Sequence, residues 1–407
     1  MRLNLAAGLL GTFTLAAAST FAILVTRYED ASHPTRIIAI LLVLIAIHGM
    51  RHLRLWFSRE VLLNLAFLGY SLLTLLWTEN VKAAIETLPA FTTFSLALIL
   101  FSSLAAYHDA RALLCGVFAG FMAAAGLYSL STGFPFSYPE DFSYNTIAGM
   151  YLFGIFITLA CGAYFRMTIL PIALAIVLLA LLAATTSIKT NLGVALGIVG
   201  SSILYFKFSL NQVLRNTLVV AAIGSAVVYG VMSNQVLTDR VQDGFARIST
   251  GVAVLTNREG DSGGIGLGAR ENWKNEGLKG WVSNPVFGYG VEGFRSDFGI
   301  TSHSTPVDLL YNSGLIGCTL FYGILASIAW RLLTARDTQQ RNLRARMLIF
   351  LIAYSFMSLS GNIYYESLLA IFVGVSSGIM LRLEQTAAAA PKRAAQPADA
   401  DMSVSRA

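Results

Sequence analysis

Residues 168–187 read TILPIALAIVLLALLAATTS, a run of 20 positions without one charged side chain. About 20 apolar residues in a helix are long enough to cross the hydrocarbon core of a bilayer. The backbone must satisfy its own hydrogen bonds inside that core, which a single segment can do only as a helix. This stretch therefore predicts a membrane-spanning helix.

Similar apolar runs recur along the whole chain. The 407 residues are 56% hydrophobic and only 12% charged, whereas ordinary soluble domains carry about 25% charged residues. A soluble fold could not cover so much apolar sequence, so we predict an all-α, polytopic membrane helix bundle of about twelve transmembrane helices. The predicted spans are residues 3–26, 36–50, 60–78, 87–106, 112–132, 145–165, 168–187, 191–206, 216–234, 306–330, 347–361 and 367–381.

Charge on the short connecting segments predicts the orientation. With the N-terminus inside the cell, the inside segments carry most of the lysines and arginines, and the short outside segments hold only Arg27, Arg36, Lys82 and Lys189. Positive residues are retained on the cytoplasmic side, so both termini are predicted to be cytoplasmic. The net charge of +6 is explained by this orientation. We therefore predict no nucleic-acid partner.

The domain organisation is simple. Residues 1–386 are predicted to form one membrane domain, whose first apolar run, 3–26, is interpreted as a span and not as a cleaved signal peptide, because no clear cleavage site follows it. The Ala/Pro/Lys/Asp-rich residues 387–407 are predicted to be a disordered cytoplasmic tail.

One long polar loop, residues 235–305, follows the ninth predicted span and so faces outward. Within it, 238–256 has apolar residues at helical spacing, which predicts a helix lying either on the membrane surface or against the bundle. Residues 269–283 predict a second helix. It ends at Asn284 because Pro285 disfavours helical backbone at the preceding residue.

His303 stands just before the tenth predicted span, on the outward side. Histidine changes charge near neutral pH, so it is well suited to remove a proton from a hydroxyl group. A single loop histidine is more often structural, and both interpretations remain open at this stage. No second histidine or cysteine lies at metal-ligand spacing, so we predict no metal site and no cofactor.

Several cations also lie on the outward side. The planar arginine fork can bind two phosphate oxygens at once, although a solvated polar face is the ordinary alternative. Arg270 and Lys274 are four residues apart and share a helical face beside Trp273. A lysine between two apolar runs is either functional or a side chain reaching the interface. The candidate cations are Lys189, Arg258, Arg270, Lys274, Lys279 and Arg295.

The loop contains the spacing G-x-G-x-x-G at Gly288, Gly290 and Gly293. The dinucleotide fingerprint needs a preceding strand and a following helix, and this segment is predicted to face away from cytoplasmic nucleotides. We therefore predict no nucleotide site. The glycines are interpreted as allowing the backbone to bend closely around something.

Two quoted runs carry a resemblance to a known family. Residues 268–299, GARENWKNEGLKGWVSNPVFGYGVEGFRSDFG, and 302–317, SHSTPVDLLYNSGLIG, resemble the loop signature of the O-antigen ligase and O-antigen polymerase superfamily. Residues 75–90, 144–156 and 185–199 match more weakly. The chain departs from the family at two places, with Ser304 where asparagine is common and Lys189 where arginine is common.

The resemblance implies a GT-C-like fold and a metal-independent, inverting glycan transferase of the bacterial inner membrane. The donor would be a glycan on undecaprenyl diphosphate, and the acceptor lipid A core or another glycan, with the active site on the periplasmic face. It implies catalytic roles for His303 and Arg270. The other implied site residues are Lys189, Arg258, Lys274, Trp273, Tyr289 and Arg295 for substrate, and Pro285, Gly288 and Gly290 for the shape of the loop.

Three alternatives remain open. A polymerase that joins lipid-linked repeats, for O-antigen or exopolysaccharide, would use the same chemistry as a ligase. A secondary transporter also has about twelve spans with both termini inside, although no half-to-half repeat is visible here. A purely structural membrane protein is the third alternative.

Overall fold

The computed structural model describes most of the chain as helix. The described residues are 2–25, 34–49, 53–133, 144–165, 169–184, 267–335, 341–359, 361–364 and 366–394, with a few isolated positions between 190 and 242. No strand occurs among them. The helices are α1 (Arg2–Val25), α2 (Pro34–Gly49), α3 (Leu53–Trp56), α4 (Arg59–Leu73), η1 (Thr74–Leu76), α5 (Val81–Tyr107), α6 (Ala110–Thr132), α7 (Tyr144–Tyr164), α8 (Ile169–Ala184), α12 (Leu267–Ser283), α13 (Gly293–Phe298), α14 (Thr305–Thr334), α15 (Arg341–Ser358) and α16 (Ser367–Ala394).

The prediction of a helical membrane protein is supported. Every predicted span that falls on described residues is a helix. Six helices in the described part of the chain are long and apolar enough to cross a membrane, and the apolar runs of α7 and α8 are shorter. The predicted spans 191–206 and 216–234 and the predicted helix 238–256 lie outside the continuously described residues. The total of twelve spans therefore stays a prediction.

The last helix continues into the predicted C-terminal tail. Helix α16 extends to Ala394, so residues 387–394 belong to this helix. Four consecutive alanines, Ala387 to Ala390, extend the helix beyond its apolar part, and alanine is the strongest helix former. The remaining residues of the predicted tail, 395–407, lie outside the described part.

Small residues bring two pairs of helices into close contact. Gly116 and Gly120 face α1, where a Cβ atom on Gly120 would stand 2.4 Å from the Ala17 carbonyl oxygen. Gly374 and Gly378 likewise face α5, and α16 packs along that helix. Both pairs have the G-x-x-x-G spacing, which lets backbones approach closely where lipid supplies no hydrophobic driving force between helices.

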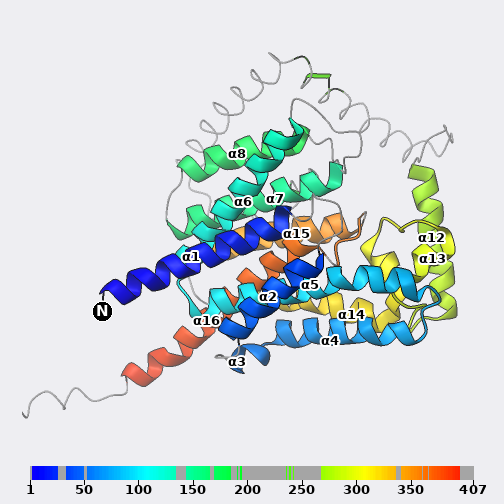
Figure 1. Ribbon diagram of the computed structural model, residues 1–407, viewed down its shortest axis with the longest axis horizontal. Helices are drawn as coiled ribbons and strands as arrows, with labels where there is room; N and C mark the ends of the chain where they lie inside the picture. Colours follow the sequence, from blue (N-terminus) through cyan, green and yellow to red (C-terminus); the bar gives the residue numbers. More distant parts are fainter. Residues whose placement is uncertain are drawn as a thin grey trace, which may run out of the picture.

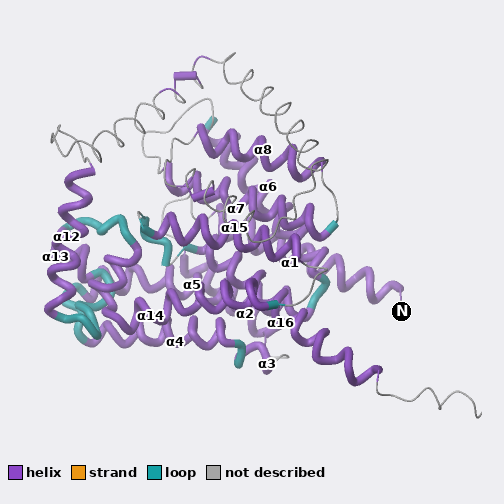
Figure 2. Tube along the Cα trace, turned by 180° about the vertical axis from the view of Figure 1, so that it is seen from behind, coloured by secondary structure: helices purple, strands orange, loops and turns teal. Residues whose placement is uncertain are grey.

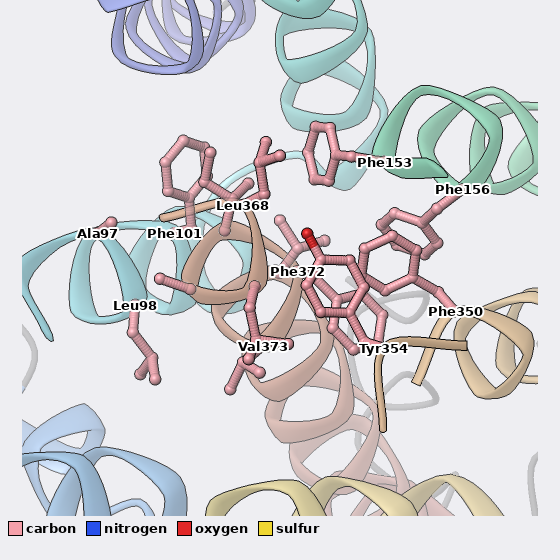
Figure 3. Close-up of a cluster of buried hydrophobic side chains, with 14 of the residues drawn as sticks. Ala97, Leu98, Phe101, Phe153, Phe156, Phe350, Tyr354, Leu368, Phe372 and Val373 are labelled. Carbon is pink, nitrogen blue, oxygen red and sulfur yellow. The ribbon is translucent and has the colours of Figure 1, made fainter. Parts of the chain in front are cut away.

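An aromatic cluster fills the centre of the bundle (Figure 3). The ring of Phe350 on α15 lies 4.4 Å from that of Phe372 on α16 and 4.7 Å from that of Phe156 on α7, measured between centroids. Tyr354 stacks beside Phe350 at 4.6 Å. These tilted contacts join α7 to α15 and α16, which come much later in the sequence.

The two ends of the bundle differ. Helix α12 runs across one end, beside α13 and the start of α14, whereas α1 begins and α16 ends at the opposite end (Figure 1). At that opposite end the buried carboxylate of Glu60 accepts hydrogen bonds from Arg331, Ser327 and Ser377 at 2.8, 2.6 and 3.0 Å. Pairing makes a buried charge tolerable, and this group ties α4, α14 and α16 together.

Candidate functional site

Helix α14 is interrupted at Gly314, where φ is 60° and ψ is −162°. A break leaves backbone groups without helical partners, which is costly inside a membrane unless other protein groups pair with them. The turn that follows α12 supplies these partners. The hydrogen bonds run from Tyr289 N to Tyr311 O at 2.9 Å, from Gly290 N to Asn312 O at 2.7 Å, and from Leu315 N to Pro285 O at 2.9 Å.

Two glycines allow this turn to approach α14 and Thr78 closely. Gly288 has a φ of +70°, and a Cβ atom there would stand 2.6 Å from three backbone atoms of α14. Gly290 has a φ of +95°, and its Cβ would stand 2.8 Å from the Cα of Thr78. Glycine adopts such backbone angles freely and leaves the space empty. The turn therefore packs directly on α14 and on Thr78, just beyond η1.

His303 has an unusual backbone conformation. Its φ is +53°, and only one other non-glycine residue in the described part of the chain, Glu292, has a positive φ. Such a conformation costs about 1–3 kcal/mol and persists only where neighbours enforce it. Here the hydroxyl of Ser302 donates to the carbonyl of Ser304 at 2.9 Å and accepts from its N–H at 3.1 Å. The two serines thus close a tight turn with His303 at its tip.

Asp308 holds this turn in place from the first part of α14. One carboxylate oxygen accepts from the N–H of Ser302 at 3.1 Å. The other accepts from the amide of Asn362 at 2.7 Å and the hydroxyl of Tyr364 at 3.0 Å. Asp308 is only 3% exposed. A buried carboxylate with these partners fixes the turn before α14 against the segment between α15 and α16.

Thr305 makes a second connection to the same segment. Its N–H and hydroxyl both donate to the carbonyl of Gly361, at 3.1 and 2.6 Å. Its hydroxyl also accepts from the N–H of Ile363 at 2.8 Å. The residues on both sides of His303 are therefore fixed by neighbours from another part of the chain.

Helix α12 brings a tryptophan and a lysine to the same place. The ring of Trp273 lies 6.4 Å from that of His303, tilted by 39°. The amino group of Lys274 donates to the carbonyl of Leu359, at the end of α15, at 3.2 Å. Arg270 lies on α12 one turn earlier, and helical spacing places it on the same face; the position of its side chain is outside the described part. Figure 2 shows the connecting loops gathered around α12 and α13 at this end.

Arg295 belongs to a different contact. It is 63% exposed and lies 3.9 Å from a carboxylate oxygen of Glu292. The other oxygen of Glu292 accepts from the hydroxyl of Thr87 at 2.9 Å. This contact joins α13 to α5, and His303 takes no part in it.

A pocket of about 470 Å³ lies beside the turn that follows α12. Its lining residues are Trp77, Glu79, Asn284, Phe287 and Tyr289. Tyr289 also has a packing role, because its ring stacks on that of Tyr311 at 4.7 Å and its hydroxyl donates to the carbonyl of Gly280 at 3.1 Å. Tyr289 therefore lines the pocket and, like Trp273, packs against the small buried cluster of Phe294, Val307 and Tyr311.

The sequence-predicted site residues thus fall into distinct places. The rings of His303 and Trp273 lie close together, Lys274 contacts the end of α15, and Arg270 lies on the same helix as Trp273 and Lys274. Pro285, Gly288 and Gly290 form the turn on α14, and Tyr289 lines the pocket next to it. Two predicted residues, Lys189 and Arg258, lie outside the described part of the chain.

Two residues of this region are absent from the sequence-based predictions. Asp308 could have been found, because a carboxylate inside a predicted apolar span signals function or a buried partner. Asn312 carries a weaker signal. Its side-chain oxygen accepts from the N–H of Phe294 at 2.7 Å and so fixes the start of α13 on α14.

Comparisons with known proteins do not assign a family. No protein family model matches the chain, and no curated protein matches it. Within the described residues, no group of three or more His, Cys, Asp or Glu side chains is arranged to hold a metal ion. The function is therefore argued from the residues themselves.

Proposed function

We propose that this protein transfers a glycan from a lipid diphosphate, such as undecaprenyl diphosphate, to a hydroxyl group of an acceptor glycan. The observation that carries the proposal is the conformation of His303. A histidine held at φ +53° by flanking serines and a buried aspartate, with a tryptophan ring 6.4 Å away, is a strained residue that its surroundings keep in place. Strain of this kind is concentrated at active sites.

His303 would act as the general base. Its imidazole takes the proton of the acceptor hydroxyl as the oxygen attacks the anomeric carbon of the donor, which contributes about 10²–10⁴-fold to the rate. The new glycosidic bond forms as the bond from the anomeric carbon to the diphosphate oxygen breaks. The diphosphate leaves with the bonding electron pair, and attack from the opposite side inverts the anomeric centre. The proton then passes from His303 to solvent.

Cations near His303 would stabilise the leaving diphosphate. Negative charge on the departing oxygen grows in the transition state, so a cation fixed nearby lowers the barrier. Lys274 is held at Leu359 O, close to the end of α15, and we assign Arg270 to the same role from its place on α12. Lys189 and Arg258 would assist, as the family resemblance implies.

A lipid-linked donor suits a protein whose site borders the bilayer. The six long apolar helices embed the chain, and α12 covers one end of the bundle. We propose that this end is periplasmic in a bacterial inner membrane and that the opposite end, with both termini, is cytoplasmic. A donor already carried to the outer face would then need no nucleotide at this site.

One observation bears on the alternative of a secondary transporter. Interrupted helices such as α14 often bind substrate or ions in transporters through their free backbone groups. Here the carbonyls of Tyr311 and Asn312 and the N–H of Leu315 are paired with the turn 285–290. The break is therefore used to attach that turn, which favours an enzyme whose outer loop shapes the site.

The test is complementation with His303→Asn in a strain that lacks the gene. Asparagine tolerates positive φ better than other residues but cannot take a proton near neutral pH, so this variant separates chemistry from folding. Ser296→Ala, at an exposed position of α13, is the control. We expect surface glycan to be lost with His303→Asn at equal membrane abundance.

The accumulated precursor identifies the reaction. Long lipid-linked chains indicate a lost ligase, and single lipid-linked repeats indicate a lost polymerase. Normal surface glycan with His303→Asn would refute the base assignment. If deletion of the gene left every surface glycan unchanged, the proposal of glycan transfer would fail.

A further inference from the structure

The pocket beside the turn 284–289 has no part in the chemistry assigned to His303. Three of its five lining residues are aromatic, Trp77, Phe287 and Tyr289. Its one charged lining residue is Glu79, which makes no ion pair within the described part of the chain. A carboxylate without a neighbouring cation repels phosphate. The pocket thus differs chemically from α12, whose cations Arg270 and Lys274 are assigned to the diphosphate.

The walls of the pocket are fixed in advance. The rings of Trp77 and Phe287 meet edge to face at 6.3 Å. The hydroxyl of Tyr70 donates to the carbonyl of Phe287 at 3.0 Å, which holds the backbone of this residue. The side-chain amide of Asn284 donates to the carbonyl of Gly288 at 2.6 Å. Rigid walls lower the entropy that binding must overcome, so a ligand would meet a surface that is already formed.

We infer that this pocket binds an uncharged sugar unit of the glycan that the protein processes, an inference that rests on the proposed function. The C–H groups of a pyranose form an apolar face that packs on an aromatic ring, whose face is electron-rich. Its hydroxyls need acceptors, which the Glu79 carboxylate and the side-chain oxygen of Asn284 provide. The volume of about 470 Å³ lies within the range of small-molecule sites, about 300–1,000 Å³.

Two other occupants fit less well. A quaternary ammonium group needs ring faces that surround it, whereas Trp77 and Phe287 contact each other edge to face and leave no space between them. An isoprenoid chain would cover Glu79 and Asn284 without offering either a hydrogen bond, which is unfavourable for buried polar groups. A sugar satisfies both the aromatic and the polar parts of the wall.

The position of the pocket suits a glycan that extends beyond one sugar. The turn from Pro285 to Gly290 lines the pocket on one side and packs on α14, the helix that begins just after His303. A glycan with one sugar in the pocket can therefore continue along the same end of the bundle. That glycan is either the acceptor or the outer part of the donor, and kinetics distinguishes the two.

The test measures sugar binding directly. The full chain is placed in lipid nanodiscs, because maltoside detergents would compete, and saturation-transfer NMR is recorded with uncharged trisaccharides of glucose, galactose, mannose and N-acetylglucosamine. The variants are Phe287→Ala and Glu79→Ala. Their controls are Phe57→Ala, at a 75% exposed position next to α3, and Glu86→Ala, at an exposed position of α5.

We expect at least one trisaccharide to bind. Each pocket variant should lower its affinity about tenfold, as loss of a charged hydrogen bond or a ring contact does. The control variants should bind it with normal affinity. The inference is overturned if no trisaccharide binds, or if Phe287→Ala weakens binding and Glu79→Ala does not, which would indicate an apolar ligand. In transfer assays with Phe287→Ala, a raised KM for acceptor or for donor identifies the source of the sugar. If sugar binding depends on the pocket but His303→Asn keeps full transfer activity, the pocket stands and the assigned chemistry fails.

Discussion

Replacement of Gly288 by alanine tests whether the turn after α12 is held on α14 by close backbone contact. The chain provides a matched control in Gly299, since φ is +70° at Gly288 and +72° at Gly299. A Cβ atom at Gly288 would stand 2.6 Å from backbone atoms of α14, whereas nothing lies within 4 Å of one at Gly299. The two variants share the backbone strain and differ only in the contact.

The magnitude follows from the hydrogen bonds at stake. Left-handed backbone costs alanine about 1–2 kcal/mol at either position. At Gly288 the contact must also widen from 2.6 Å to at least 3.4 Å, which breaks bonds of 2.7 to 2.9 Å between the turn and α14. Three such bonds contribute about 1 kcal/mol each. Gly288→Ala should therefore destabilise the turn by about 3 kcal/mol more than Gly299→Ala.

Hydrogen exchange measured by mass spectrometry is the assay. If the free energy of local opening is lower by about 3 kcal/mol, the amide hydrogens exchange roughly a hundredfold faster. We expect this increase for a peptide covering residues 285–290 in Gly288→Ala, and little change there in Gly299→Ala. Equal exchange of that peptide in the two variants would refute the argument that backbone contact with α14 holds the turn.

Three further changes test other parts of the molecule. Asp308→Ala removes the acceptor that fixes the turn around His303. We expect the free energy of unfolding to fall by about 3 kcal/mol or more in a thermal melt, and glycan transfer to be lost in complementation. Glu60→Ala leaves Arg331 with only its exposed partner Glu384 and removes the acceptor of two buried serines at the other end of the bundle, which should lower the free energy of unfolding by about 1–3 kcal/mol in a detergent melt. Gly378→Ala should lower stability by about 1–3 kcal/mol through overpacking against α5, whereas Gly126→Ala, with open space around it, should raise stability by up to about 1 kcal/mol in the same melt.

Each of these expectations has an outcome that contradicts it. Normal transfer by Asp308→Ala would show that His303 does not depend on the buried carboxylate. A stable Glu60→Ala variant would mean that the ion pair is balanced by its desolvation. If Gly378→Ala and Gly126→Ala melt at the same temperature, the contact between α5 and α16 does not depend on the small size of glycine.

The sequence determines the helices of this protein. Whether a segment can enter a membrane depends on the sum of its own residues, and a segment in lipid must be helical, so hydropathy alone locates α1, α5, α6 and the other long apolar helices. The position at which α12 ends is also determined locally, because Pro285 disfavours helical backbone at the residue before it. The extension of α16 to Ala394 has a local cause too, since Ala387 to Ala390 are strong helix formers.

The arrangement around His303 is decided only by the tertiary structure. The span 306–330 is predicted as uninterrupted, and its break at Gly314 is stable because the turn 285–290 pairs with the freed backbone groups. Two of the partners of Asp308, Asn362 and Tyr364, lie 54 and 56 residues further along the chain. The spacing of a motif does not report hydrogen bonds between distant segments, since their free energy exists only once folding has brought those segments together.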